Sequence, residues 1–459
     1  FIANYRKAYE NESADIVNHY GGIARFFRAL FYFEKLKRFG DVPWYSAPQY
    51  EGSPGLYKPR DPRTIVVDSI MADLDFAIAN VRATKSVSRV TKWAALALKS
   101  RAALFEGTFR KYHEELGLKP TADNLLRAAL EAAQEIMASG QYSLYSTGNP
   151  ASDYLQLFAA ESANTAEYIL ARVYDQEFNK TTPLNNIFTS HTNLTPGITR
   201  SLVNSYLASD GTPISLRPGY PELTFWEETR DRDPRLAQTI RTPGYTRIGQ
   251  TTPLVPDFAN AYTGYHNVKF LTGTNHDGGG NTNDLPVLRY AEVLLNYAEA
   301  KPELGELTEA DADLSINNLR QRAGMPNMNV GALVADPFLL DQYQRSDDVM
   351  VLEIRRERRV ELAMEGFRYY DLIRWKEGQL LAELFEGMYV PGPGTYDLDN
   401  NGTNDVAVID NVEDNVAGLQ NILLGPDRAL SNGASGNIVV HPGIDKAFVD
   451  PKHYYFPLP

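Results

Sequence analysis

The sequence predicts a mostly α-helical protein, in which helical hairpins of the tetratricopeptide type form a scaffold that carries a loop-rich insert and a few short strands. Three observations support this fold class. The first third of the chain has apolar residues at helical spacing, residues 146–284 are rich in Pro, Gly, Thr and Asn, and helical texture returns after residue 285. The tail from residue 387 again has the texture of loops and strands.

Four helices are expected before residue 146. Gly40 is a stop signal for the first of them, shortly before Pro43, and Thr91 is a good N-cap for the third. The expected segments are 16–40, 61–81, 91–112 and 124–145. Paired helices with Ala at close-packing positions, followed by a short Gly/Pro break, are typical of stacked tetratricopeptide hairpins, although the period here is irregular.

Helical texture resumes in three later segments, 288–306, 311–325 and 354–375. Pro302 interrupts the first of these, so that helix is expected to end early or to kink there. The insert between the two helical regions is expected to carry short helices and a few strands. Its Gly-rich run at 275–284 is expected to be a mobile loop.

Composition and charge exclude several classes of protein. The net charge of −13 and the pI near 5.1 argue against a nucleic-acid-binding protein, which would present a basic footprint. The chain has no cysteine, so it has no disulfide framework, no thiolate zinc site and no cysteine nucleophile. No run of about eighteen apolar residues is present to span a bilayer.

The stretch IRRERRVELAMEGFRYYDLIRW, residues 354–375, holds six arginines and four acids. On a helix, three of the acids share one narrow stripe, whereas three of the arginines lie in another arc among apolar residues. The two sets are Glu357, Glu361 and Glu365, and Arg355, Arg356 and Arg359. Because a guanidinium on an apolar face is costly unless it is paired, we expect a half-buried helix whose charges meet partners on neighbouring helices.

No catalytic motif stands out. The chain has no G-x-S-x-G, no H-E-x-x-H, no Walker loop and no G-x-G-x-x-G, and its seven histidines form no i,i+3 or i,i+4 pair suited to a metal on a helix. Glycoside hydrolysis needs only two well-placed carboxylates, and 58 acids leave that reaction open.

The loop DLDNNGTNDVAVID, residues 397–410, carries the oxygen spacing of a calcium loop. Relative positions 1, 3, 5, 7 and 9 hold Asp397, Asp399, Asn401, Thr403 (through its backbone carbonyl) and Asp405. Gly402 at position 6 makes the sharp turn, but position 12 is Val408 rather than the bidentate Glu of an EF-hand. We expect a structural Ca²⁺ here and no catalytic cofactor; the alternative is a plain polar turn.

Several motifs in order resemble the SusD/RagB family, the surface glycan-binding lipoproteins of Bacteroidetes. Residues 354–375 resemble the family signature, and the resemblance runs from about residue 20 to the end. The other motifs are FFRALFYFEKLKRFGDVPW (26–44), KPRDPRTIVVDSIMADLDFAI (58–78), SRVTKWAALALKSRAALFEGTF (88–109), RDPRL (232–236), TGYHNVKF (263–270), LPVLRYAEVLLNYAEA (285–300), INNLRQRAGMP (316–326) and the terminal YYFPLP. The sequence departs from the family pattern at Pro302 and in lacking the lipoprotein leader.

The resemblance implies one domain over residues 1–459. Its helical scaffold would lie mainly in 1–145 and 285–386, and the ligand-binding face in the loop-rich regions 146–284 and 387–459. It also implies a protein that performs no catalysis, binds a glycan at the cell surface and delivers it to a SusC-like, TonB-dependent transporter. Localisation would be the outer membrane, through an N-terminal lipid that is not part of this sequence.

Aromatic residues in loops are the candidates for glycan contact, because sugars stack their C–H faces on rings in concave, preorganised sites. The candidates are Trp44, Tyr45, Tyr50, Tyr57, Tyr220, Trp226, Tyr262, Tyr265, His266 and His276. Trp44 and Tyr265 lie inside family motifs and are the most readily explained by packing. We predict that loops 45–57 and 272–284 carry the site.

Two other functions remain open on the sequence. One is a helical glycoside hydrolase, which would release new reducing ends from an oligosaccharide. The other is a peptide-binding or protein-interaction scaffold that uses tetratricopeptide-like grooves. Neutral polysaccharide, host glycan and peptide are all open as ligands, although the negative charge disfavours a highly sulfated polymer.

Overall fold

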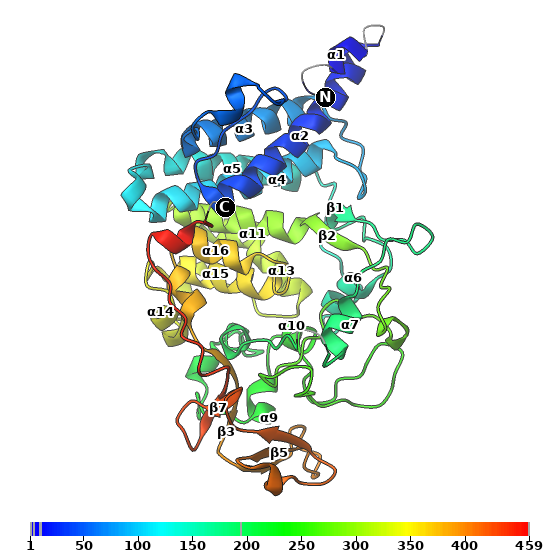
Figure 1. Ribbon diagram of the computed structural model, residues 1–459, viewed down its shortest axis with the longest axis vertical. Coiled ribbons are helices and arrows are strands. Elements are labelled where there is room, and N and C mark those ends of the chain that lie inside the picture. The colour runs from blue at the N-terminus through cyan, green and yellow to red at the C-terminus, as the bar shows by residue number, and fades with distance from the viewer. Residues whose placement is uncertain (1, 3–4, 9–11, 193–194, 458–459) are drawn as a thin grey trace.

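The computed structural model describes residues 2, 5–8, 12–192 and 195–457. Its longer helices stack in successive layers, and the loop-rich parts of the chain lie beside and beyond them (Figure 1). The longer helices are α2 (Ala14–Phe39), α3 (Arg63–Asn80), α4 (Lys92–Tyr112), α5 (Ala122–Ala138), α11 (Tyr290–Glu303) and α15 (Val349–Glu361). The shorter ones are α1 (Tyr5–Ala8), α6 (Asp153–Ala159), α7 (Leu184–Thr189), α8 (Arg200–Val203), α9 (Phe225–Thr229), α10 (Pro234–Ala237), α12 (Glu309–Leu314), α13 (Ile316–Arg322), α14 (Pro337–Gln342) and α16 (Arg368–Arg374).

The strands form three small sheets. They are β1 (Tyr168–Arg172), β2 (Leu285–Arg289), β3 (Phe385–Val390), β4 (Gly394–Tyr396), β5 (Val406–Ile409), β6 (Gln420–Leu423), β7 (Arg428–Leu430) and β8 (Gly436–Val440). β1 pairs antiparallel with β2, and a second sheet has the order β3-β8-β7. The third has the order β4-β5-β6, in which β5 and β6 run parallel. The prediction of a mostly α fold with few short strands is confirmed.

The stacked helices pack in the order α2, α3, α4, α5, α11 and α15. The small side chains of α4 allow the closest approach: a Cβ at Gly107 would lie 2.9 Å from Cγ of Leu126 on α5. The Ser100 hydroxyl donates to the Ala129 carbonyl of α5 at 3.0 Å. Thr91 caps α4 as expected, because its side chain accepts from the Ala94 amide at 3.2 Å. Helices that approach this closely need small residues at the contact, so the Ala-rich pattern was a sound signal.

Helix ends differ from the sequence expectation in two places, and agree with it in a third. The segment 124–145 is helical only as far as Ala138, and residues 141–147 are extended or irregular. The segment 311–325 is broken at Ser315, which has φ −130° and ψ −88°. Pro302 ends α11 early, as expected, because it occupies the last turn.

The charged stretch 354–375 is two helices rather than one. The helix α15 ends at Glu361, and α16 begins at Arg368. Met364 and Gly366 in the connection have φ values of +63° and +81°, which a helix cannot contain. Glu365 therefore lies in a turn, although it still meets the same ion-pair network as the acids of α15.

The prediction that the charges of this stretch meet partners on neighbouring elements is confirmed, and the stretch is more deeply buried than the half-buried helix expected. Arg355, Arg356, Arg358 and Glu361 are between 0% and 3% exposed. Arg358 Nε lies 3.0 Å from Asp371, and Arg356 Nη2 lies 2.6 Å from Asp336. A buried guanidinium without a carboxylate would carry a large desolvation cost, so these partners allow a helix with so many charges to occupy the centre of the fold.

The same network ties the insert to the scaffold. Glu361 accepts hydrogen bonds from Arg235 of α10, from Arg289 at the end of β2 and from Arg322 of α13, at 3.0, 2.8 and 2.5 Å. Lys269 of the insert lies 2.7 Å from Glu365. Burial alone would raise the pKa of Glu361, but Arg322, Arg289 and Arg235 outweigh it and hold that pKa well below its usual range.

The chain returns to the scaffold at its C-terminal end (Figure 1). The Phe456 amide donates to the Arg38 carbonyl at 2.7 Å, and Tyr454 is buried in the core formed by α2, α3 and α4. Leu458 and Pro459 of the terminal motif lie outside the described residues. A second core forms between the insert and the tail sheets and includes Phe225, Tyr265 and Val408. Among the described residues, no helix combines the length and apolarity required to cross a bilayer.

Candidate functional site

The loop between α2 and α3 presents two largely exposed rings. Tyr50 is 71% exposed and Tyr57 is 86% exposed. The Tyr50 amide donates to the Ser53 hydroxyl at 2.9 Å, and Tyr57 ends a short 3₁₀ turn that begins at Pro54. Both rings therefore lie on an ordered loop. Their faces are exposed to water, and the apolar face of a ligand could cover them.

Trp44 and Tyr45 make contacts that stabilise this loop, and their rings are less exposed to solvent than those of Tyr50 and Tyr57. The Trp44 ring lies 4.1 Å from that of Tyr32, centroid to centroid, and the Trp44 amide donates to Asp61 at 2.7 Å. The Tyr45 amide donates to the Tyr32 hydroxyl at 2.8 Å, and its own hydroxyl donates to the Leu56 carbonyl at 3.2 Å.

A lysine closes the base of the loop. Lys58 Nζ donates to the Trp44 carbonyl at 2.7 Å and to Asp61 at 2.5 Å. The Lys58 ammonium and the Trp44 amide lower the pKa of Asp61. These bonds join the two ends of the loop, so the exposed rings are held before any ligand arrives.

A cavity of about 590 Å³ opens beside this loop. Arg60 and Pro62 from the end of the loop line it on one side, and Tyr455 and Phe456 of the C-terminal segment line it on another. Asp41, at the start of the loop, adds a carboxylate. Rings, an arginine and an acid in one hollow are the side chains that a saccharide site uses.

The aromatic candidates of the insert have different surroundings. Tyr265 is fully buried and its hydroxyl donates to Glu228 at 2.6 Å, so the structure contradicts its assignment as a ligand-stacking residue. His266 is also buried. Tyr220 and Trp226 are half-buried around α9, and the Tyr220 hydroxyl accepts from Asn204 at 3.1 Å.

The loop 272–284 is held in place rather than free. Asn281 and Asn283 are buried, and Asn281 Nδ2 donates to Asn185 at 2.8 Å. His276 is half-buried, with its Nδ1 2.8 Å from the Thr272 hydroxyl. Hydrogen bonds thus connect both ends of the Gly-rich run to neighbouring residues, and its mobility stays a prediction from the sequence. In Figure 1 this loop lies on a different part of the molecule from loop 45–57.

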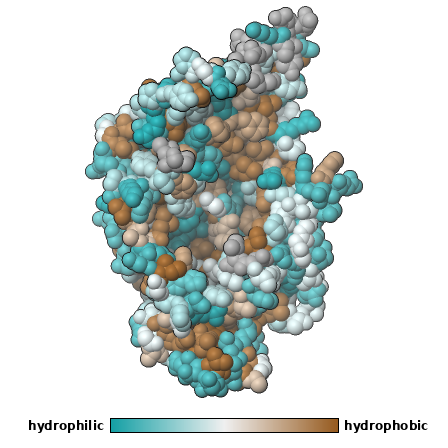
Figure 2. Space-filling model, in the orientation of Figure 1, coloured by the Kyte–Doolittle hydropathy of each residue, from teal (hydrophilic) through white to brown (hydrophobic). Residues whose placement is uncertain are grey.

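A groove that sequence reasoning missed extends from the scaffold to the contact between the insert and the tail. We use "the groove" for three adjacent cavities of about 280, 460 and 240 Å³, called the first, second and third cavity. The first and second share Phe367 and Asp371 as lining residues, and the second and third share Gly197 and Thr199. Figure 2 shows the molecule hollowed in the middle of this face, where apolar and polar side chains meet.

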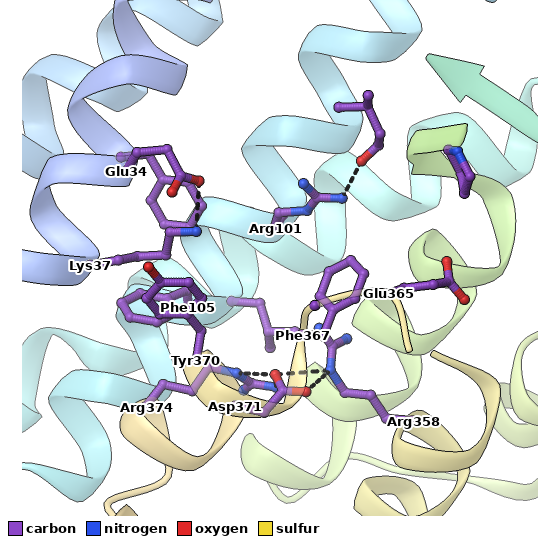
Figure 3. Close-up of a pocket in the computed structure, with 15 residues that line it drawn as sticks. Glu34, Lys37, Arg101, Phe105, Arg358, Glu365, Phe367, Tyr370, Asp371 and Arg374 are labelled. Carbon is purple, nitrogen blue, oxygen red and sulfur yellow. Dashed lines mark hydrogen bonds and ion pairs between the residues drawn. The ribbon is translucent and has the colours of Figure 1, made fainter. Parts of the chain in front are cut away.

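The first cavity lies between α2, α4 and α16 (Figure 3). Its cations are all paired. Lys37 lies 2.7 Å from Glu34, Arg101 lies 2.6 Å from Glu292 and Arg374 lies 2.9 Å from Asp371. Burial lowers the pKa of Lys37, and Glu34 opposes that shift. Because each of these cations has a carboxylate partner, the cavity is polar but has no net preference for anions.

The third cavity contains one of the predicted residues. Tyr262 lines it together with His441 and Phe385. The Arg428 guanidinium lies 3.9 Å from the Tyr262 ring centroid and occupies one face of that ring. Tyr262 is thus the predicted site residue that the structure brings to the groove, whereas Trp44, Tyr45, Tyr50 and Tyr57 share the other loop.

The loop 397–405 brings three carboxylates together. Oxygens of Asp397, Asp399 and Asp405 lie within 4.8 Å of one another. Burial raises the pKa of Asp405, and the neighbouring Asp399 and Asp397 raise it further. Backbone amides already engage Asp397, because Gly402 N donates to it at 2.7 Å. The residue types and spacing fit a hard cation.

Comparison with known proteins identifies relatives along most of the chain. The SusD family model matches residues 158–459. SusD-like protein P38 of Formosa agariphila is 25% identical over 382 residues, which are 77% of this chain and 66% of P38. This chain therefore spans just under two thirds of the length of that relative.

Two solved structures share the fold. A SusD-like carbohydrate-binding protein from Bacteroides fragilis superposes with a TM-score of 0.69 at 24% identity, over 98% of this chain and 79% of that one. A surface glycan-binding protein A from Bacteroides uniformis gives a TM-score of 0.54 at 19% identity, over 82% of this chain and 70% of that one.

Proposed function

This chain belongs to the SusD family, and from that premise we propose that it binds an oligosaccharide and releases it unchanged. The proposal rests on one observation above others: Tyr50 and Tyr57 are 71% and 86% exposed on a loop that hydrogen bonds hold in place. Exposed rings on a rigid loop lose little conformational entropy when a sugar face covers them, which favours binding.

The two similar structures agree with this function through their names, which describe a carbohydrate-binding and a glycan-binding protein. The cavity beside the loop would supply polar contacts to the sugar hydroxyls from Asp41 and Arg60. No step of the proposed function needs a proton transfer or a nucleophile.

A glycan panel measured by calorimetry tests the proposal. We expect the double variant Tyr50→Ala/Tyr57→Ala to lose at least tenfold in affinity for the glycan that wild type binds, since each stacked ring contributes about 1 kcal/mol. Phe178→Ala is the matched control, because Phe178 is another surface ring, 69% exposed, on a different loop. Equal loss in the control and the double variant would contradict the assignment of the loop.

The same samples test the competing functions. Incubation with each glycan followed by a reducing-end assay should show no turnover; release of new ends would make the protein a glycoside hydrolase. Peptide binding without any glycan binding would favour an interaction scaffold instead.

We propose further that the protein acts at the cell surface with a SusC-like, TonB-dependent transporter and is held at the outer membrane by an N-terminal lipid. The family membership supports this role. Co-purification of the lipidated protein from outer membranes with such a transporter tests it, and recovery of the protein from the periplasm without a transporter would contradict it.

We propose also that Asp397, Asp399, Asn401, Thr403 and Asp405 bind a structural Ca²⁺. The convergence of three carboxylates supports this, because like charges this close repel one another without a cation. The residue at position 12, Val408, is buried in β5 and gives no oxygen, so the site would have fewer protein ligands than an EF-hand.

A further inference from the structure

The second cavity contains two arginines that face no carboxylate. Arg359 Nη1 donates to the Gln342 side-chain oxygen at 2.9 Å, and Arg359 Nη2 donates to the Ser201 hydroxyl at 2.7 Å. Arg368 Nη1 donates to the Tyr343 hydroxyl at 2.7 Å. Among the described residues, no acid lies within ion-pair distance of either guanidinium. The hydrogen bonds of both groups therefore go to neutral acceptors.

This arrangement differs from that of the adjoining first cavity. In the adjoining first cavity, Lys37, Arg101 and Arg374 each have a carboxylate partner. Burial lowers the pKa of Arg359 to about 9, and the positive charge of Arg368 adds to that shift. Two like charges thus share one partly buried cavity in a protein whose net charge is −13. An anion would relieve this repulsion.

The acids nearest to the two arginines are not positioned to neutralise them. Asp371 lines the cavity, but its oxygens already accept from Arg358 at 3.0 Å and from Arg374 at 2.9 Å. Glu383 is exposed and lies beyond ion-pair distance. Burial raises the pKa of Glu383, and Arg359 and Arg368 oppose that shift. Glu383 therefore interacts electrostatically with both arginines without forming an ion pair with either.

The rest of the cavity suits a sugar ring. Its volume is about 460 Å³, and Phe367 and Tyr369 give it aromatic walls. Leu202 and Met364 add apolar surface, and Thr199 adds a hydroxyl. Apolar walls around a few fixed polar groups are the usual composition of a small-molecule site.

We propose that the second cavity is a subsite for a carboxylate-bearing sugar, such as a uronic acid unit of an oligosaccharide, with Arg359 and Arg368 as its carboxylate-binding pair. The inference rests on the proposed glycan-binding function and narrows its ligand class. Guanidinium groups match a planar carboxylate through parallel N–H donors, and the neutral acceptors they now use leave further donors for a ligand.

The first experiment uses wild-type protein and two forms of one ligand. Oligogalacturonate and its fully methyl-esterified form have the same length and sugar rings but differ in charge. Calorimetry should give at least tenfold weaker binding of the ester, and the difference should shrink with added salt. Equal binding of acid and ester, for this and for an oligoalginate pair, would overturn the proposal without any variant.

The second experiment assigns the charge preference to the cavity. Arg368→Gln and Arg359→Gln should each reduce affinity for the acidic ligand at least tenfold and leave affinity for the ester within about twofold. The matched control is Arg127→Gln, which changes net charge equally on α5, where Arg127 pairs with Glu306 at 2.7 Å. A loss of the same size in the control would show a long-range charge effect and overturn the proposal.

The two proposals fail in different ways. Binding of neutral glycans with no preference for uronates overturns the carboxylate subsite and leaves the glycan-binding function intact. Binding of sulfated oligosaccharides through both arginines, with uronates excluded, overturns the carboxylate assignment. Binding of no glycan at all overturns the proposed function and the subsite together. Thermal melts identify any variant that fails to fold. In that case the comparison of acid and ester binding to wild type alone tests the carboxylate subsite.

Discussion

Arg289 Nη1 and Glu361 Oε1 lie 2.8 Å apart in the interior of the protein, and this ion pair joins the end of β2 to the end of α15. Both side chains are almost completely buried, at 2% and 0% exposure. Glu361 also contacts Arg235 and Arg322, so a single carboxylate connects the insert to two helices of the scaffold. The charged stretch is therefore the structural link between the two parts of the fold.

Removing that carboxylate should destabilise the whole protein. We expect Glu361→Gln to lower the free energy of unfolding by about 3–5 kcal/mol, because three guanidinium groups then lose a shared partner in a buried site. Urea denaturation followed by far-UV circular dichroism measures this. Glu413→Gln, at an exposed position, is the control and should change stability very little. A small effect at Glu361 would mean that water or another acid replaces it.

Stability should fall in acid through Glu299. Burial alone would raise the pKa of Glu299, but Arg374, Arg358 and Arg355 lower it to about 2, compared with an ordinary value of 4.5. A carboxyl whose folded pKa is depressed stabilises the protein above pH 4.5, and that stabilisation is lost as pH falls toward 2. The free energy of unfolding of wild type and Glu299→Gln should differ most at pH 7 and converge near pH 2. Parallel curves would contradict this.

The buried Tyr265 should act on stability and not on ligand binding. Its hydroxyl donates to Glu228 at 2.6 Å, and burial raises the pKa of that acid. We expect Tyr265→Phe to cost about 1–3 kcal/mol of stability, since a buried carboxyl loses a donor. Glycan affinity, measured by calorimetry, should stay within twofold of wild type. A large change in glycan affinity at unchanged stability would mean that Tyr265 takes part in ligand binding.

Removal of calcium should lower the thermal stability of the tail sheets. The loop 397–405 leads directly into β5, whose residues Val406 and Val408 are buried. We expect Tm to fall by several degrees with EGTA and to recover with Ca²⁺, since a ligand that binds only the folded state stabilises it. Asp399→Asn should reduce the shift. An unchanged Tm, together with no Ca²⁺ binding by calorimetry, would make the loop a polar turn.

Glu383 should weaken the binding of acidic sugars. Its carboxyl interacts electrostatically with Arg359 and Arg368 without pairing with either of them. We expect Glu383→Gln to tighten oligogalacturonate binding by about threefold, because the two arginines then no longer interact with a competing carboxylate. Its esterified form should bind unchanged. Weaker binding of the acid would mean that Glu383 contacts the ligand directly.

The sequence by itself determined the helical scaffold and the role of the charged stretch. Apolar spacing and the Thr91 cap located α4 within a residue, because local signals fix helix ends when nothing competes with them. The pairing of that stretch's charges with neighbouring elements followed from the cost of burying an unpaired guanidinium, and that cost is the same in any fold. The resemblance to the SusD family was also present in the linear order of motifs.

Only the tertiary structure decided which rings and charges are available to a ligand. Tyr57 and Tyr265 both lie in loops, yet one is 86% exposed and the other is buried against Glu228, 37 residues away in the sequence. Arg359 donates to Ser201, 158 residues away in the sequence, whereas Arg358 pairs with Asp371. No spacing rule predicts which of these two neighbouring arginines has a carboxylate partner. Exposure and charge pairing depend on contacts between distant segments, and the sequence order does not encode those contacts locally.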